Sequence, residues 1–197
     1  MPHRSFTKHD LSMLLVCVIW GANYSIIKQA FAYIAPIPFS AIRYVIASAL
    51  LLVLARWLEP RVPIPRRTAW WLLGLGIVGN TFNQIAWLTG LRLTTATNSS
   101  LIFASLPVVV AILGTTFGVA RSSPRLVLGI VIGTVGVAIV IAAKGLHFSS
   151  DTLRGDLLTV VAVLCWAAFT VGIRHAGQGI TPLRLTALTT LAGTPGL

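Results

Sequence analysis

Hydrophobic positions along this chain form long runs that charged residues interrupt only at wide intervals. Lys, Arg, Asp and Glu are absent from residues 11–27, 69–91, 93–120, 126–143 and 157–173. An α-helix needs about 20 apolar residues to cross a bilayer core, and each run approaches or exceeds that length. The pattern predicts an all-α, polytopic membrane helix bundle. Its expected spans are about 11–29, 36–57, 69–90, 96–119, 125–143, 155–174 and an incomplete span at 182–197.

The composition is that of a membrane protein and not of a soluble domain. Hydrophobic residues make up 56% of the 197 residues, charged residues only 10%, and the mean hydropathy is +0.87. Soluble domains carry about 25% charged residues. We therefore expect the lipid bilayer to be a partner of this chain.

The formal net charge of +11 follows the short loops between spans, which argues against nucleic-acid binding. The N-terminal leader and one set of alternate loops carry ten Lys and Arg residues, whereas the other set carries four. The ten are Arg4, Lys8, Arg56, Arg61, Arg66, Arg67, Arg121, Arg125, Arg174 and Arg184, and the four are Lys28, Arg92, Lys144 and Arg154. The positive-inside rule then predicts a cytoplasmic N-terminus.

Two of the predicted spans carry a stripe of polar and aromatic residues. The first consists of Trp20, Asn23, Tyr24 and Lys28, and the second of Asn80, Asn83, Gln84 and Trp87. Residues three or four positions apart share one face of a helix, so each set forms a single surface. Unpaired amides are costly in hydrocarbon, so these surfaces need partners. Two interpretations remain open: hydrogen bonds between helices, or a polar cavity that receives a substrate.

Four other features carry weaker signals. Arg43 inside the second span either reaches the membrane surface or faces an anionic ligand, and Lys28 is either an interfacial anchor or such a contact. Pro107 predicts a kink in the fourth span, which would free the carbonyl group near Phe103. Small residues on one side of the fifth span predict close helix contact, and these are Gly129, Gly133 and Gly136.

An internal repeat is visible at an offset of 146 residues. Trp20 corresponds to Trp166, Lys28 to Arg174 and Pro36 to Pro182. Five spans separate equivalent points, so the second copy would enter the membrane from the opposite side. Inverted repeats of this kind are common in secondary transporters, whose substrate site lies between the two copies.

Taken together, these residues resemble the EamA family of the drug/metabolite transporter superfamily. The resemblance rests on Trp20-Gly21-x-Asn23-Tyr24, on the Pro36 to Arg43 spacing, on LTTATNSSLIFASLPV with its Pro107, and on GIVIGTVGVAIVI. It covers nearly the whole chain. It implies a first EamA repeat over residues 1–145 and the start of a second over residues 155–197.

The resemblance also implies a function. A family member has two inverted five-helix repeats, cytoplasmic termini and a central cavity for small metabolites such as amino acids or related compounds, usually exported and without a cofactor. The expected location is a cell membrane, the inner membrane of a bacterium. The implied cavity-lining residues are Trp20, Asn23, Tyr24, Asn83, Gln84, Trp87 and Ser99. Because a family member would continue beyond Leu197, we expect a fragment, a truncated product or a homo-oligomer that completes the cavity.

The sequence offers little support for catalysis. The four acids, Asp10, Glu59, Asp151 and Asp156, fall in predicted loops or helix ends, which predicts no intramembrane carboxylate for proton transfer. Metal-ligand clusters, paired carboxylates and nucleophile motifs are absent from the sequence, so we expect neither a metal site nor an enzyme. The alternative to a carrier is an inactive fragment or a membrane interaction protein that does not transport; a channel fits less well.

Overall fold

The structure is a computed structural model that describes residues 8–60, 63–121, 123–144 and 150–197. The described helices are α1 (Lys8–Ala30), α2 (Pro36–Leu58), α3 (Arg66–Gly76), α4 (Asn83–Leu93), α5 (Ala96–Phe103), α6 (Leu106–Thr116), α7 (Pro124–Lys144), α8 (Ser150–Ala176) and α9 (Pro182–Gly193). A π-helical segment, η1 (Ile77–Phe82), joins α3 to α4, and a 3₁₀ turn, η2 (Thr194–Gly196), follows α9. Strands are absent from these residues, which confirms the predicted all-α bundle.

Several helices have the length and composition of membrane spans. Among the described residues, four are long and apolar enough to cross a membrane: Asp10–Ala30, Pro36–Leu58, Ala96–Thr116 and Thr152–Ala176. The continuous helical stretch from α3 through η1 to α4 is as long as these candidate spans. It differs from them in that it contains the amides of the second polar stripe. Many large apolar side chains on α1, α2 and α7 are exposed, as expected for surfaces that face lipid.

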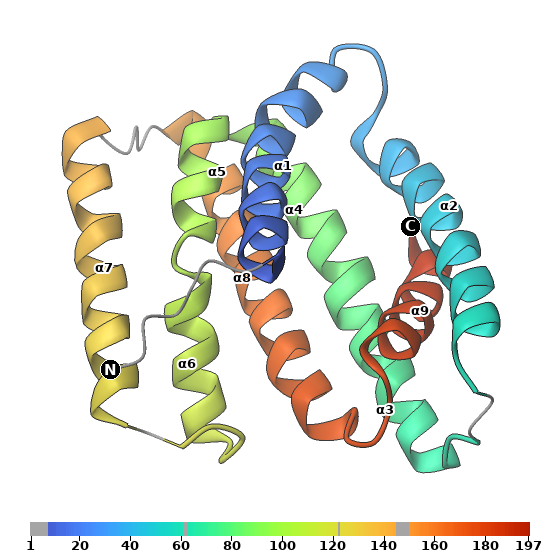
Figure 1. Ribbon diagram of the computed structural model, residues 1–197. Coiled ribbons are helices and arrows are strands. Elements are labelled where there is room, and N and C mark those ends of the chain that lie inside the picture. The colour runs from blue at the N-terminus through green and yellow to red at the C-terminus, as the bar shows by residue number, and fades with distance from the viewer. Residues whose placement is uncertain (1–7, 61–62, 122, 145–149) are drawn as a thin grey trace.

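Successive spans run in alternating directions, and α8 lies near the middle of the bundle (Figure 1). α8 packs along α4 and also contacts α5 and α6, whereas α9 lies against α2 and α3. α7 stands at one edge beside α6 (Figure 1). A buried apolar core forms between α1, α4 and α8 and includes Ile27, Leu88, Leu91 and Ala162.

The close approach of α4 and α8 depends on two glycines. A Cβ atom at Gly155 would lie 2.6 Å from the backbone nitrogen of Thr94 and 2.8 Å from the carbonyl oxygen of Gly90. A Cβ atom at Gly90 would lie 2.9 Å from the carbonyl oxygen of Gly155. Any side chain at either position would force the two backbones apart.

The small-residue face predicted for α7 makes no such contact. A Cβ atom added at Gly129, Gly133 or Gly136 would meet no described atom within 4 Å. The prediction of close helix packing through these glycines is therefore wrong for the contacts within this structure. Their spacing indicates a smooth surface, but it does not identify a partner.

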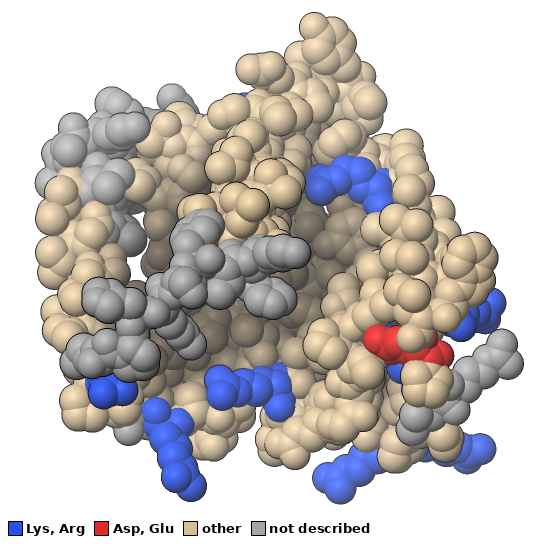
Figure 2. All heavy atoms as spheres, viewed as in Figure 1, with Lys and Arg blue, Asp and Glu red and all other residues tan. Residues whose placement is uncertain are grey.

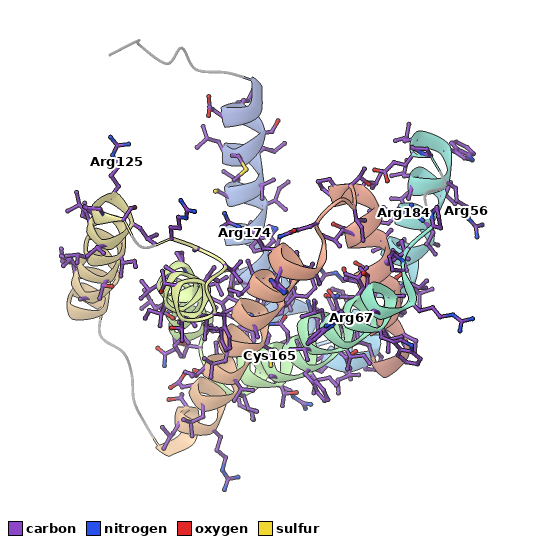
Figure 3. The ribbon with its side chains drawn as sticks, turned by 90° about the horizontal axis from the view of Figure 1, so that it is seen from below. Arg56, Arg67, Arg125, Cys165, Arg174 and Arg184 are labelled. Carbon is purple, nitrogen blue, oxygen red and sulfur yellow. The ribbon has the colours of Figure 1, made fainter. Side chains whose placement is uncertain are left out.

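Arginine residues gather at one end of the bundle, here called the basic end. It is the end where α2, α6 and α8 finish and where α3, α7 and α9 begin, and it carries Arg56, Arg66, Arg67, Arg121, Arg125, Arg174 and Arg184. Figure 2 shows most of the visible Lys and Arg side chains toward the lower edge of the molecule, and Figure 3 looks at that end from below. The opposite end, here called the distal end, carries Lys28, Arg92, Lys144 and Arg154 at helix positions.

Candidate functional site: a cavity with an aromatic wall

A cavity of about 210 Å³ lies between α1, α2, α4, α5 and α8. It is lined by Trp20, Asn23, Tyr24, Arg43, Tyr44, Asn83, Gln84, Trp87, Phe103 and Trp166. Six of the seven residues predicted to line a substrate cavity thus lie around one space, together with Arg43. Whether they bind a substrate stays a prediction.

Aromatic rings form most of the cavity wall. Tyr24 meets the ring of Trp87 edge to face at a centroid distance of 5.5 Å, and Phe103 lies 6.3 Å from Tyr24 and 6.2 Å from Trp87. On the other side, Trp20 meets Trp166 at 6.5 Å. Edge-to-face contacts pair the positive rim of one ring with the negative face of another. Such walls stabilise apolar or cationic parts of a ligand.

Two amides of the second stripe connect helices. The Asn83 amide donates to the carbonyl oxygen of Ala162 on α8 at 2.8 Å, and the Asn80 amide donates to that of Thr189 on α9 at 2.9 Å. Both side chains are buried. The interpretation of these amides as hydrogen bonds between helices therefore holds for Asn80 and, in part, for Asn83, which also borders the cavity.

Gln84 uses only one half of its amide. Its Nε2 donates to the Tyr44 hydroxyl at 2.9 Å, and that hydroxyl donates in turn to Asn80 at 3.4 Å. The Gln84 Oε1 and the indole Nε1 of Trp87 are buried without a hydrogen-bond partner among the described residues. Buried polar atoms without partners are uncommon and call for an explanation, and here both belong to the cavity wall.

Arg43 is the one formally charged side chain among the residues that line this cavity. It is exposed, and its guanidinium carbon lies 5.4 Å from the centre of the Phe39 ring. The two interpretations of Arg43 are compatible with this position, because an exposed guanidinium at a cavity edge can reach solvent or an anionic ligand.

Three residues singled out from the sequence lie away from the cavity lining. Lys28 donates to the carbonyl oxygens of Leu91 and Thr94, each at 2.5 Å, and so caps the C-terminal end of α4. Ser99 is 0% exposed, and its hydroxyl has no hydrogen-bond partner in the described part of the chain. Pro107 lies in the first turn of α6, after the interruption at residues 104–105 that separates α5 from α6.

One acidic residue is placed differently from its prediction. Asp156 lies in the second turn of α8 and is 4% exposed, because α8 begins at Ser150, five residues before the predicted span. Its carboxylate accepts the Thr94 hydroxyl at 2.5 Å and the Asn98 amide at 3.3 Å. Asp156 is therefore a buried carboxylate in a helix that is long and apolar enough to cross a membrane.

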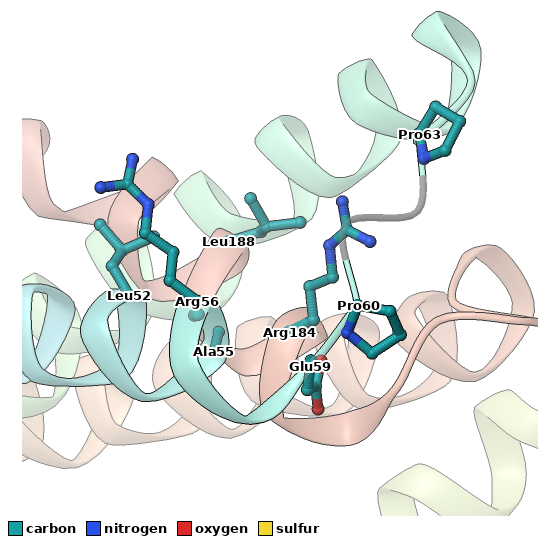
Figure 4. Close-up of a pocket in the computed structure, with 9 residues that line it drawn as sticks. Leu52, Ala55, Arg56, Glu59, Pro60, Pro63, Arg184 and Leu188 are labelled. Atoms are coloured by element: carbon teal, nitrogen blue, oxygen red, sulfur yellow. The ribbon is translucent and has the colours of Figure 1, made fainter.

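Sequence reasoning did not anticipate a second cavity at the basic end. It has a volume of about 660 Å³ between α2 and α9 and includes Leu52, Arg56, Glu59, Arg184 and Leu188 (Figure 4). The Thr181 hydroxyl donates to the Glu59 carboxylate, which ties the end of α2 to the start of α9. The described residues contain no group of three or more His, Cys, Asp or Glu side chains arranged to hold a metal ion.

Comparisons with known proteins agree on one family. The sequence model of the EamA-like transporter family matches residues 7–142. An uncharacterised transporter of Archaeoglobus fulgidus is 30% identical over 167 residues, which cover 84% of this chain and 57% of that protein. Transporter YyaM of Bacillus subtilis, also uncharacterised, is 28% identical over 95% of this chain and 62% of its own length.

A further relative has a more specific name. A probable amino-acid metabolite efflux pump of Salmonella typhimurium is 28% identical over 163 residues, which cover 81% of this chain and 51% of that protein. The chain thus spans about three fifths of the first two relatives and about half of this one. No solved structure matches the chain. The family match covers more than half of the sequence, and the chain therefore belongs to the EamA-like transporter family.

Proposed function

We propose that this protein acts in a secondary carrier that exports small carboxylate-bearing metabolites, such as amino acids or related compounds, through the aromatic-walled cavity. The observation that carries this proposal is the composition of the wall: aromatic rings, one exposed guanidinium and two unpartnered polar atoms. Arg43 would hold a carboxylate, because a guanidinium binds carboxylates in a two-point geometry. The rings would contact the apolar part of the substrate.

The unpartnered atoms of Gln84 and Trp87 are shielded from solvent in this conformation. A substrate would meet them only after the cavity wall has moved. A carrier supplies such movement, because it alternates between conformations open to either side of the membrane. An acceptor on Gln84 and a donor on Trp87 suit a ligand that carries both kinds of polar group.

Two contacts support the inverted repeat that the proposal assumes. Trp20 touches Trp166, and the Ser48 hydroxyl lies 2.8 Å from that of Thr194; both pairs are separated by 146 residues, the offset of the repeat. Residues near a pseudo-two-fold axis meet their own equivalents, so these contacts are what two inverted copies would produce. α1 and α8 also run in opposite directions (Figure 1).

We also propose a direction of transport and an orientation of the protein in the membrane. The excess of arginine at the basic end supports a cytoplasmic location for that end and for the N-terminus. Export is supported by the name of the Salmonella relative, which describes an efflux pump. The membrane in question would be the cell membrane.

The experiment measures export from cells that are loaded with amino acids through dipeptides. We expect expression of the protein to speed the release of at least one amino acid, Arg43→Gln to abolish this gain, and Arg92→Gln to retain it. Arg92 is exposed at the distal end and does not border the cavity, so it is a matched control for loss of charge. Release equal to that of cells without the protein would favour the alternative, a membrane interaction protein that does not transport by itself.

A further inference from the structure

Two charged residues from different helices meet at one helix turn at the distal end. Lys28 of α1 donates to the Thr94 carbonyl oxygen at 2.5 Å, and Asp156 of α8 accepts the Thr94 hydroxyl at 2.5 Å. Thr94 caps the C-terminal end of α4, and the next residue, Thr95, caps the start of α5. A single residue thus joins a cation on α1 and an anion on α8 to the turn between α4 and α5.

This cluster holds a buried carboxylate. Among the described residues, Asp156 accepts hydrogen bonds from the Thr94 hydroxyl and the Asn98 amide. Asp156 is nearly fully buried, and burying a charge without partners is costly. The positive charge of Lys28, which bonds to the backbone carbonyl of the same threonine, offsets part of that cost. Separating the three elements would therefore break the hydrogen bonds that Thr94 makes with Lys28 and Asp156.

The cluster lies next to the cavity. Lys28 follows Tyr24 by four residues on α1, and Leu91, another acceptor of Lys28, follows Trp87 by four residues on α4. Four residues of α-helix rise by about 6 Å on the same face. The charged cluster thus lies one helical turn beyond the aromatic wall, toward the distal end.

The repeat gives Lys28 and Asp156 equivalents in the sequence. At the offset of 146 residues, Lys28 corresponds to Arg174 and Asp156 corresponds to Asp10, within the matching segments Lys8-His9-Asp10-Leu11 and Arg154-Gly155-Asp156-Leu157. Arg174 lies in the last turn of α8, and Asp10 lies in the first turn of α1. These positions are inverted relative to those of Lys28 and Asp156.

We propose that Lys28, Thr94 and Asp156 form a latch that holds the cavity closed at the distal end, and that Arg174 and Asp10 belong to the equivalent latch at the basic end. The inference rests on the proposed carrier function and orientation. In such a carrier the two latches alternate. The distal latch is engaged while the basic end is open, and the latch at the basic end is engaged while the distal end is open. The four charges are positioning residues that set which end is open, and they do not contact the substrate.

The test measures access to the cavity from each side of the membrane. Cys17 and Cys165 are replaced by Ser, and Asn23→Cys supplies a single probe in the cavity wall. A membrane-impermeant maleimide is applied to intact cells and, separately, to inside-out vesicles. We expect Asp156→Asn to raise the labelling rate from outside at least tenfold, and Asp10→Asn to lower it while raising labelling in inside-out vesicles.

Four further variants keep the test decisive. Thr94→Val leaves every charge in place and should also speed labelling from outside, so the result does not depend on whether Asp156→Asn folds. Lys28→Gln should act in the same direction. Arg92→Gln and Arg154→Gln remove only side-chain charges at the distal end, and the Arg92 carbonyl oxygen that accepts from Lys28 at 3.1 Å remains, so both variants should leave the rate unchanged. The latch would be overturned if Thr94→Val and Lys28→Gln are labelled at the same rate as Arg92→Gln. It would also be overturned if Asp156→Asn is labelled more slowly from outside than the parent.

The labelling assay needs no substrate, so it separates this inference from the proposed function. Altered labelling without any detectable export would leave the latch standing and count against the proposed substrates. Amino-acid export with unchanged labelling would support the carrier and overturn the latch.

Discussion

The crossing of α4 and α8 gives the sharpest stability prediction, through the substitution Gly155→Ala. The new Cβ atom would lie 2.6 Å from the backbone nitrogen of Thr94, 2.7 Å from the carbonyl carbon of Leu93 and 2.8 Å from the carbonyl oxygen of Gly90. All three are backbone atoms, which cannot rotate away as a side chain can. The two helices must therefore separate.

The expected magnitude follows from two opposing effects. Overpacking a well-filled contact costs about 1–3 kcal/mol, and three backbone contacts favour the upper part of that range. Alanine regains about 1 kcal/mol of helix propensity relative to glycine. The net loss should be about 1–2 kcal/mol, which lowers Tm by roughly 2–8 °C for a chain of this size.

The assay is the thermal stability of the detergent-solubilised protein, followed as loss of monodisperse material on heating. Gly133→Ala is the matched control, because a Cβ atom there meets no described atom within 4 Å. That variant should be as stable as the parent or slightly more stable. If Gly155→Ala proves as stable as Gly133→Ala, the close contact between α4 and α8 is not present and the reasoning fails.

The cavity wall yields further predictions. Asn83→Leu removes a hydrogen bond to α8 and should lower stability by about 0.6–1.7 kcal/mol. Gln84→Leu removes the hydrogen bond to Tyr44 on α2, so it should cost a similar amount, and it should also reduce export at least tenfold; normal export by this variant would remove Gln84 from the site. Trp20→Ala removes an edge-to-face contact with Trp166 that is worth about 0.5–1.5 kcal/mol, and it should reduce export with normal membrane insertion on immunoblots. Normal export by Trp20→Ala would remove that residue from the site.

The membrane-spanning helices were predictable because lipid imposes a simple rule on the chain. Any segment that crosses the hydrocarbon core must be apolar and helical, so the uncharged runs predict the described helices with small errors at their ends. Such an error placed Asp156 at the very end of a predicted span, whereas it lies in the second turn of α8. The start of α8 lacks an apolar pattern before Leu153, and only its packing against the α4–α5 turn identifies Asp156 as buried.

The cavity was predictable only in part. Polar residues within apolar spans identified Asn23, Asn83 and Gln84, but the sequence does not indicate which amide is used to connect helices. Phe103 lies among mostly apolar neighbours and Tyr44 follows Arg43, and tertiary packing brings both to the cavity. Trp166 could have been predicted as a cavity residue, because it is the repeat equivalent of Trp20.

Saturable flux in proteoliposomes tests the central claim most directly. Vesicles that contain the protein are loaded with an unlabelled amino acid, and the entry of the same labelled amino acid is measured over a range of concentrations. A carrier predicts exchange that saturates with concentration and is lost in Arg43→Gln but not in Arg92→Gln. Exchange that equals that of protein-free vesicles, or that rises linearly with concentration and is indifferent to Arg43→Gln, would contradict transport through this cavity.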